Sequence, residues 1–177
     1  MSGKDDILHK AKEEMSLSET ILSAIPGFKG YKEKELRRES DRLIRNHFYR
    51  RLKEAEDLLK KVFQRLSDSR IYGVLEDVDR LVMEFDRVKA RVDHASYGYS
   101  GFFDIIKIDE RDLEEMLSFD VGLIDSVEKL FDRAKTLKEV EVDKVEEVRK
   151  GLESIRSSLE GFEEAFNERR EKIWGVK

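Results

Sequence analysis

The sequence predicts an all-α fold: an elongated antiparallel four-helix bundle with a coiled-coil-like core and an additional N-terminal helix. Three observations predict it. Apolar residues recur every three or four positions along several long segments, which is the spacing of one face of an α-helix. Charged residues make up 42% of the 177-residue chain and fill most of the gaps between the apolar positions. Helix-forming residues are abundant, and together with this charge and the apolar spacing they indicate long helices with solvated outer faces.

The clearest apolar pattern lies in residues 139–171. Its seam alternates in steps of three and four and consists of Val145, Val148, Leu152, Ile155, Leu159, Phe162 and Phe166. Such a seam has to lie against other helices to leave water. If the chain dimerises, the span from Val145 to Phe166 is the seam that we expect to be used.

The N-terminal part, residues 1–31, is expected to form a helix over 4–24 and then a loop rich in Gly and aromatic residues. Pro26 disfavours helical backbone at the residue before it, and two glycines permit a turn. Within the helix we expect five apolar side chains to face inward: Ile7, Ala11, Met15, Ile21 and Leu22.

Residues 32–96 are predicted to form a helical hairpin. Its helices cover 32–67 and 70–96, and the polar turn Ser67-Asp68-Ser69 joins them. A turn this short makes the two helices antiparallel neighbours.

A second Gly–aromatic loop follows at 97–108, and a second hairpin at 109–172. Asp109 can cap the first helix of this hairpin, which is expected to end at 137. The alternating directions of the four long helices predict that both Gly–aromatic loops lie at the same end. No linker divides the chain, so residues 1–177 are expected to form a single helical domain.

Composition excludes several classes of site. The absence of cysteine excludes disulfides, thiolate chemistry and cysteine-bound metals. The net charge of −5 gives no broad attraction to nucleic acid, so we do not expect that partner.

No stretch approaches the roughly 20 apolar residues of a membrane span, and no signal peptide is evident, so a cytoplasmic location is expected. No cofactor is expected. One Gln and two Asn beside abundant Glu, Lys and Arg indicate a thermophilic source.

The two Gly–aromatic loops are candidates for partner binding. Aromatic side chains dominate the anchors of protein interfaces. In the alternative interpretation, these side chains cap the end of the bundle core and the glycines only supply turns. The six residues are Phe28, Tyr31, Tyr97, Tyr99, Phe102 and Phe103.

An arginine-rich stretch, residues 37–51, is a candidate phosphate site. Arg38, Arg42 and Arg45 share a helix face, and residues 32–61 hold eleven basic and seven acidic side chains. Guanidinium groups suit bidentate contacts to phosphate or carboxylate. Residues 139–171 hold eleven acidic and six basic side chains. The alternative is therefore that the arginines pair with this segment or with acidic residues of their own helix, namely Glu33, Glu35, Glu39 and Asp41.

Asp120 falls on the inward stripe of its predicted helix, and by register roughly level with His47, Arg50 and Arg51. A buried carboxylate needs a partner. It could hold a metal or act as a base, or it could form a structural salt bridge. A shift of register that turns Phe119 inward and Asp120 outward is a further alternative.

Two acidic pairs, Glu54-x-x-Asp57 and Glu76-x-x-Asp79, lie on the two arms of the first hairpin. This arrangement is similar to that of all-helical nucleotide pyrophosphohydrolases, which use Glu-x-x-Glu and Glu-x-x-Asp to hold Mg²⁺ at a triphosphate. The similarity covers one hairpin, and the chain departs from the pattern at Asp57, where Glu is expected.

The sequence thus favours a non-enzymatic interaction or scaffold protein that binds a partner protein or a second copy of itself. It contains no Gly-x-Ser-x-Gly motif and no Gly-rich phosphate loop. Phosphate or nucleic-acid binding through the arginine face, and Mg²⁺-dependent nucleotide hydrolysis, are the alternative hypotheses.

Overall fold

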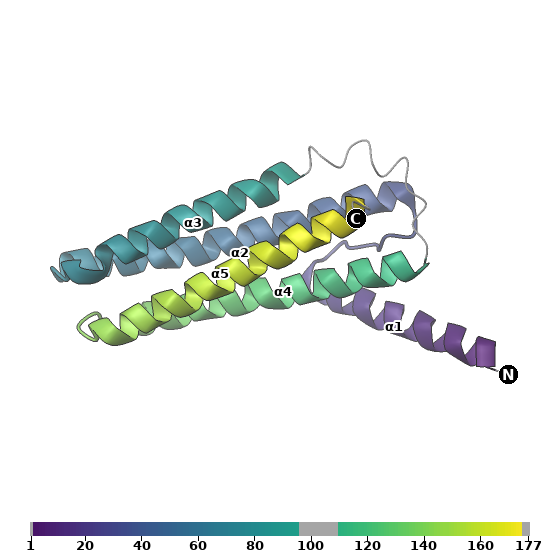
Figure 1. Ribbon diagram of the computed structural model, residues 1–177, viewed down its shortest axis with the longest axis horizontal. Coiled ribbons are helices and arrows are strands. Elements are labelled where there is room, and N and C mark those ends of the chain that lie inside the picture. Colours follow the sequence, from purple (N-terminus) through teal and green to yellow (C-terminus); the bar gives the residue numbers. More distant parts are fainter. Residues whose placement is uncertain (1, 96–109, 175–177) are drawn as a thin grey trace.

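The computed structural model of the chain describes residues 2–95 and 110–174. Within these ranges all regular structure is helical, which confirms the predicted all-α class (Figure 1). The elements are α1 Ser2–Ala24, α2 Lys34–Asp68, the short 3₁₀ helix η1 Tyr72–Val74, α3 Leu75–His94, α4 Glu110–Glu139 and α5 Val145–Trp174.

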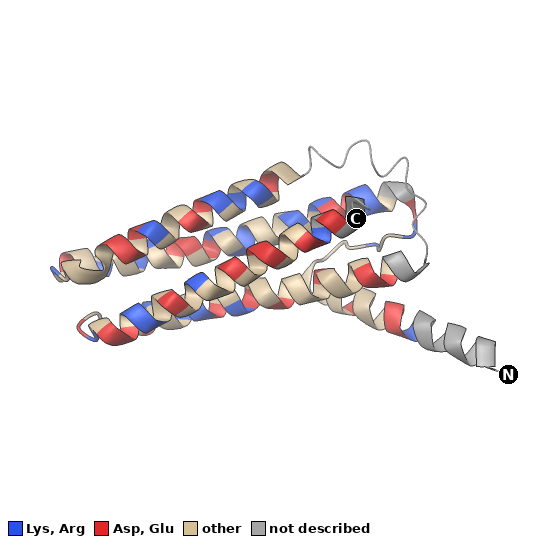
Figure 2. Cartoon of the chain, viewed as in Figure 1, with Lys and Arg blue, Asp and Glu red and all other residues tan. Residues whose placement is uncertain are grey.

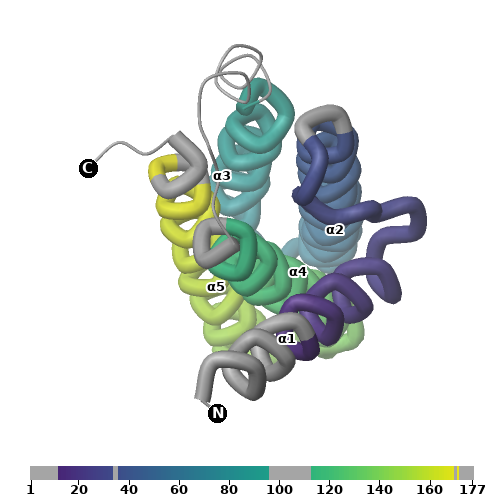
Figure 3. Tube along the Cα trace, turned by 90° about the vertical axis from the view of Figure 1, so that its right-hand side faces the viewer, coloured from purple at the N-terminus to yellow at the C-terminus, as the bar shows by residue number. Residues whose placement is uncertain are grey.

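Helices α2 to α5 pack as a bundle made of two antiparallel hairpins. In the first hairpin α3 returns along α2, and in the second α5 returns along α4. The hairpins lie side by side, with α2 next to α4 and α3 next to α5 (Figure 3). Since α2 and α4 run in the same direction, each bundle helix has one antiparallel and one parallel neighbour.

The turn after α2 delays the start of α3 by five residues relative to the prediction. Arg70 adopts the left-handed conformation at φ 59°, where glycine is usual. The amide of Ile71 donates to the carbonyl of Leu66 and that of Arg70 to Ser67, each at 2.9 Å. These two bonds form a Schellman motif, which ends α2. Because Arg70 is in the left-handed conformation, α3 cannot begin at residue 70.

The predicted seam of α5 is buried inside its own chain. Six of its seven side chains, from Val148 to Phe166, are buried in the bundle core. Phe48 of α2 meets Phe162 and Phe166 edge-on, with ring centroids 5.4 and 6.3 Å apart. The expectation that this seam serves a dimer is therefore wrong, because the chain's own helices already cover it.

Helix α1 packs beside α4 on the outside of the bundle. Ile21 is fully buried there, and Leu17 packs partly against the core. Met15 and Leu22, however, are 62% and 48% exposed, so their predicted inward position is wrong. The reason is that α1 contacts the bundle along one side only, and the side set by Ile21 leaves these two residues facing away.

The connector between α1 and α2 caps one end of the core. Gly27 and Gly30 have φ values of 91° and 84°, as the predicted turn requires. Phe28 lies between the two glycines and Tyr31 directly after them; the two rings pack edge to face and are only 5% and 2% exposed. Ser40 of α2 donates a 2.8 Å hydrogen bond to the carbonyl of Gly30, which holds the connector against the helix.

Candidate functional site

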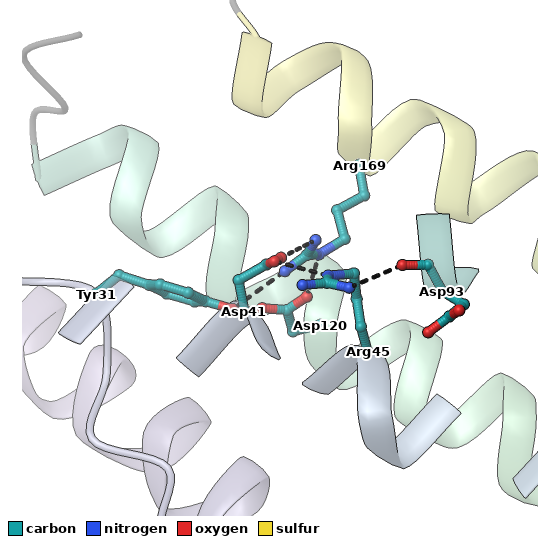
Figure 4. Close-up of polar contacts among 6 residues, drawn as sticks. All are labelled: Tyr31, Asp41, Arg45, Asp93, Asp120 and Arg169. Atoms are coloured by element: carbon teal, nitrogen blue, oxygen red, sulfur yellow. Dashed lines mark hydrogen bonds and ion pairs between the residues drawn. The ribbon is translucent and has the colours of Figure 1, made fainter. Parts of the chain in front are cut away.

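A cluster of five buried polar residues joins the connector and three helices of the bundle (Figure 4). We call it the Arg169 cluster, and no member is more than 7% exposed. The connector contributes a phenol, α2 an aspartate and an arginine, α4 an aspartate and α5 an arginine. The members are Tyr31, Asp41, Arg45, Asp120 and Arg169.

Arg169 lies at the centre of the cluster and donates to Asp120, Asp41 and Tyr31. Its Nε donates to Oδ1 of Asp120 at 2.5 Å, and its Nη1 to Oδ1 of Asp41 at 2.9 Å. Its Nη2 donates to the hydroxyl of Tyr31 at 3.2 Å. The Tyr31 hydroxyl in turn donates to Oδ2 of Asp120, so both oxygens of that carboxylate accept a hydrogen bond.

Arg45 completes the cluster on the other side of Asp41. Its Nε donates to Oδ2 of Asp41 at 2.8 Å, and its Nη1 donates to the backbone carbonyl of Asp93 at 3.4 Å. Asp41 therefore lies between two guanidinium groups. Through the Asp93 carbonyl the cluster also reaches α3, so all four bundle helices take part.

Two guanidinium groups and two carboxylates balance the charge of the cluster. Burial raises the pKa of Asp120, and the charge and hydrogen bonds of Arg169 and Tyr31 oppose this effect. Burial, followed by the neighbouring Asp120 carboxylate, raises the pKa of Tyr31 well above its usual value, so the phenol stays a donor. A buried ion pair is costly to break because the remaining charge has no water to solvate it. The arrangement is suited to fixing the register of the helices.

Asp120 is fully buried, which excludes the shift of register that would turn it outward. It forms a salt bridge, as one interpretation predicted, but with Arg169 and not with a group near His47. On α4 the residue beside His47 is Glu128, which lies two turns after Asp120. Sequence reasoning missed Arg169, although it follows Phe166 by three residues and so continues the apolar seam of α5.

His47 lies in a separate polar site between α2 and α4. Its side chain is 5% exposed, its Nε2 is 3.2 Å from Oε1 of Glu128, and its Nδ1 is 3.4 Å from Nη2 of Arg50. Burial lowers the pKa of His47; Glu128 opposes this effect, while Arg50 and Arg51 add to it. The neutral imidazole is therefore favoured in the folded chain.

This gives a prediction for pH dependence. A histidine whose pKa is lowered by folding binds protons more readily in the unfolded chain, so folding is favoured at high pH. We expect the free energy of unfolding to fall as pH drops through about 6.5, the unperturbed value, toward the lower folded pKa. Urea titrations at pH 8, 7, 6 and 5 would measure it. In the His47→Gln variant the decline between pH 7 and 6 should flatten; an identical pH profile would contradict the assignment.

The predicted arginine face does not form a single surface. Arg38 and Arg42 are exposed, whereas Arg45 is 7% exposed and belongs to the Arg169 cluster. Arg51 pairs with Glu128 of α4 and with Glu54 of its own helix, with shortest distances of 2.5 and 2.7 Å. Arg45 thus pairs with Asp41 of its own helix, as the alternative proposed, whereas Arg51 pairs with Glu54 and Glu128 and not with the acidic α5.

The acidic pairs of the first hairpin are placed differently from a metal centre. Glu54 pairs with Arg51, Glu76 pairs with Arg80 at 2.9 Å, and Asp57 and Asp79 are exposed. Among the side chains that the structure describes, no group of three or more His, Cys, Asp or Glu residues could hold a metal ion. Figure 2 shows that acidic and basic residues are instead mixed along the outside of the helices.

Of the six aromatic loop residues, the structure describes two. Phe28 and Tyr31 are part of the core, in keeping with the interpretation that they cap it. Tyr31 also borders a groove of about 270 Å³ between α1, the connector and α4, while its hydroxyl belongs to the Arg169 cluster. Tyr97, Tyr99, Phe102 and Phe103 lie outside the described residues.

The chain matches no protein-family model, no curated protein and no solved structure. Among the helices described, none has an apolar stretch long enough to cross a membrane.

One exposed surface combines apolar and charged groups on a single helix. We call it the outward face of α1 and define it by four exposed residues: Lys12, Met15, Glu19 and Leu22. Positions seven apart lie two turns apart on the same side of a helix, so Met15 is aligned with Leu22 and Lys12 with Glu19. Among the described large apolar side chains, Met15 and Leu22 are two of the five that are most exposed.

Proposed function

We propose that this chain is a non-enzymatic helical interaction protein and that the outward face of α1 contacts its partner. The observation that carries the proposal is the exposure of Met15 and Leu22, aligned two turns apart, on the side of α1 away from the bundle. Amphipathic helices bind partner helices or grooves through apolar residues at this spacing.

The bundle itself supports this role. Its apolar seams are turned inward, and the buried ions of the Arg169 cluster hold one another. Such a bundle is a rigid base for a helix that is attached along one side. Figure 1 shows α1 diverging from the bundle axis, with its N-terminal end beyond the first turn of α4.

Site-specific photo-crosslinking tests the proposal. A benzophenone amino acid is placed at position 15, 22 or 83, and each variant is irradiated in an extract of cells that produce the protein. Met83 is a matched control because it is also 62% exposed but lies on α3, apart from the outward face of α1. We expect adducts with protein from positions 15 and 22 and none from 83. Equal adducts at all three positions, or none at 15 and 22, would contradict the proposal.

A further inference from the structure

We infer that the partner of the outward face of α1 is a second copy of this chain, whose α1 packs antiparallel to the first across a twofold axis near Met15. The inference rests on the proposed function, since it names the partner of the same surface. The order of the two exposed charged residues along α1, Lys12 before Glu19, supports the inference.

Lys12 and Glu19 are both exposed and lie on either side of Met15, three residues before it and four after it. In an antiparallel pair, a twofold axis between residues 15 and 16 places Lys12 of each copy opposite Glu19 of the other. A single symmetric contact therefore creates two ion pairs of opposite charge. A parallel pair in register would place like charges together, which is unfavourable.

The same axis buries the apolar side chains. Met15 meets its symmetry mate at the centre, and its flexible thioether chain adapts well to such a contact. Leu22 lies along the N-terminal half of the α1 helix of the second copy.

The expected affinity is low. Helix α1 has 23 residues and is about 34 Å long, so two such helices bury less area than a standard interface. Exposed ion pairs add orientation more than strength. We expect a reversible dimer with a dissociation constant on the order of 100 µM at low salt, weaker at high salt.

A charge-exchange experiment in the full chain tests the arrangement. Sedimentation equilibrium is recorded at low salt for the wild type, for Lys12→Glu, for Glu19→Lys, and for an equimolar mixture of the two variants. Each variant alone would place like charges opposite one another, so we expect its dimerisation to weaken about tenfold or more. In the mixture, both pairs are again of opposite charge, and a heterodimer at least as stable as the wild-type dimer should form. The double variant Lys12→Glu/Glu19→Lys should dimerise like the wild type.

Two further variants connect the result to the apolar contact. Met15→Glu should abolish dimerisation, whereas Met83→Glu should leave it unchanged, and circular dichroism of each variant should show the wild-type helix content. A wild type that stays monomeric at millimolar concentration would overturn the inference, as would a mixture that dimerises no better than its components. Either result leaves the proposed function to be decided by crosslinking, where adducts from position 15 to another protein would retain it.

Discussion

Replacement of Arg169 by methionine is expected to lower the free energy of unfolding by about 3–5 kcal/mol, the usual cost of removing one partner of a buried ion pair. The side chain is 1% exposed and is the shared partner of Asp41 and Asp120. Without it, Asp120 loses its ion pair and one hydrogen bond, and Asp41 loses one of the two guanidinium groups that flank it. For a chain of this length, the loss corresponds to a fall in Tm of about 6–20 °C.

Thermal and urea unfolding followed by circular dichroism would measure the change. Arg80→Met is the control, because Arg80 is half exposed and its pair with Glu76 on the surface of α3 is worth about 0–1 kcal/mol. If both variants lost the same small amount, the Arg169 cluster would not hold the helices together as argued.

The second large effect is expected at Phe48, where replacement by alanine should cost about 3–5 kcal/mol. Its ring is fully buried and packs edge to face on Phe162 and Phe166, so truncation opens a cavity between α2 and α5. The next residue, Tyr49, provides the control on the same helix: it is 38% exposed, and Tyr49→Ala should change stability by less than about 1 kcal/mol. A loss at Phe48 no greater than that at Tyr49 would contradict the assigned core.

The spacing of apolar residues was sufficient to predict the helices of the bundle. The apolar residues from Val148 to Phe166 lie on one face of their helix, which predicts that this face packs against other helices, and it is buried in the structure. The start of α3 was not predictable from this spacing, because it depends on an arginine in the left-handed conformation, a role usually taken by glycine.

The sequence alone was less informative about α1. Its apolar residues occupy two sides of the helix, and periodicity does not tell which side the bundle covers. Ile21 is buried and the adjacent Leu22 is exposed because α1 has a neighbour on one side only. An expectation that all five apolar residues face inward assumes that a helix is surrounded.

The candidate site was predictable in part. The inward position of Asp120 pointed to a buried carboxylate that needs a partner, and the structure has both. The partner could not be chosen from sequence, because register between helices distant in the chain is fixed by packing. The predicted alignment of α2 with α4 was wrong by about two turns. It therefore placed Asp120 beside His47, whereas the partner in the structure is Arg169.

Methionine oxidation most directly tests the central claim, that one side of α1 belongs to the bundle and the other to a partner. In the dilute chain, Met15 and Met83 are equally exposed and should be oxidised at similar rates, whereas Met116, which is 6% exposed, should be protected. When the chain is concentrated, or mixed with the partner found by crosslinking, the account predicts slower oxidation of Met15 and an unchanged rate at Met83. Rates at Met15 and Met83 that stay equal under all these conditions would contradict it.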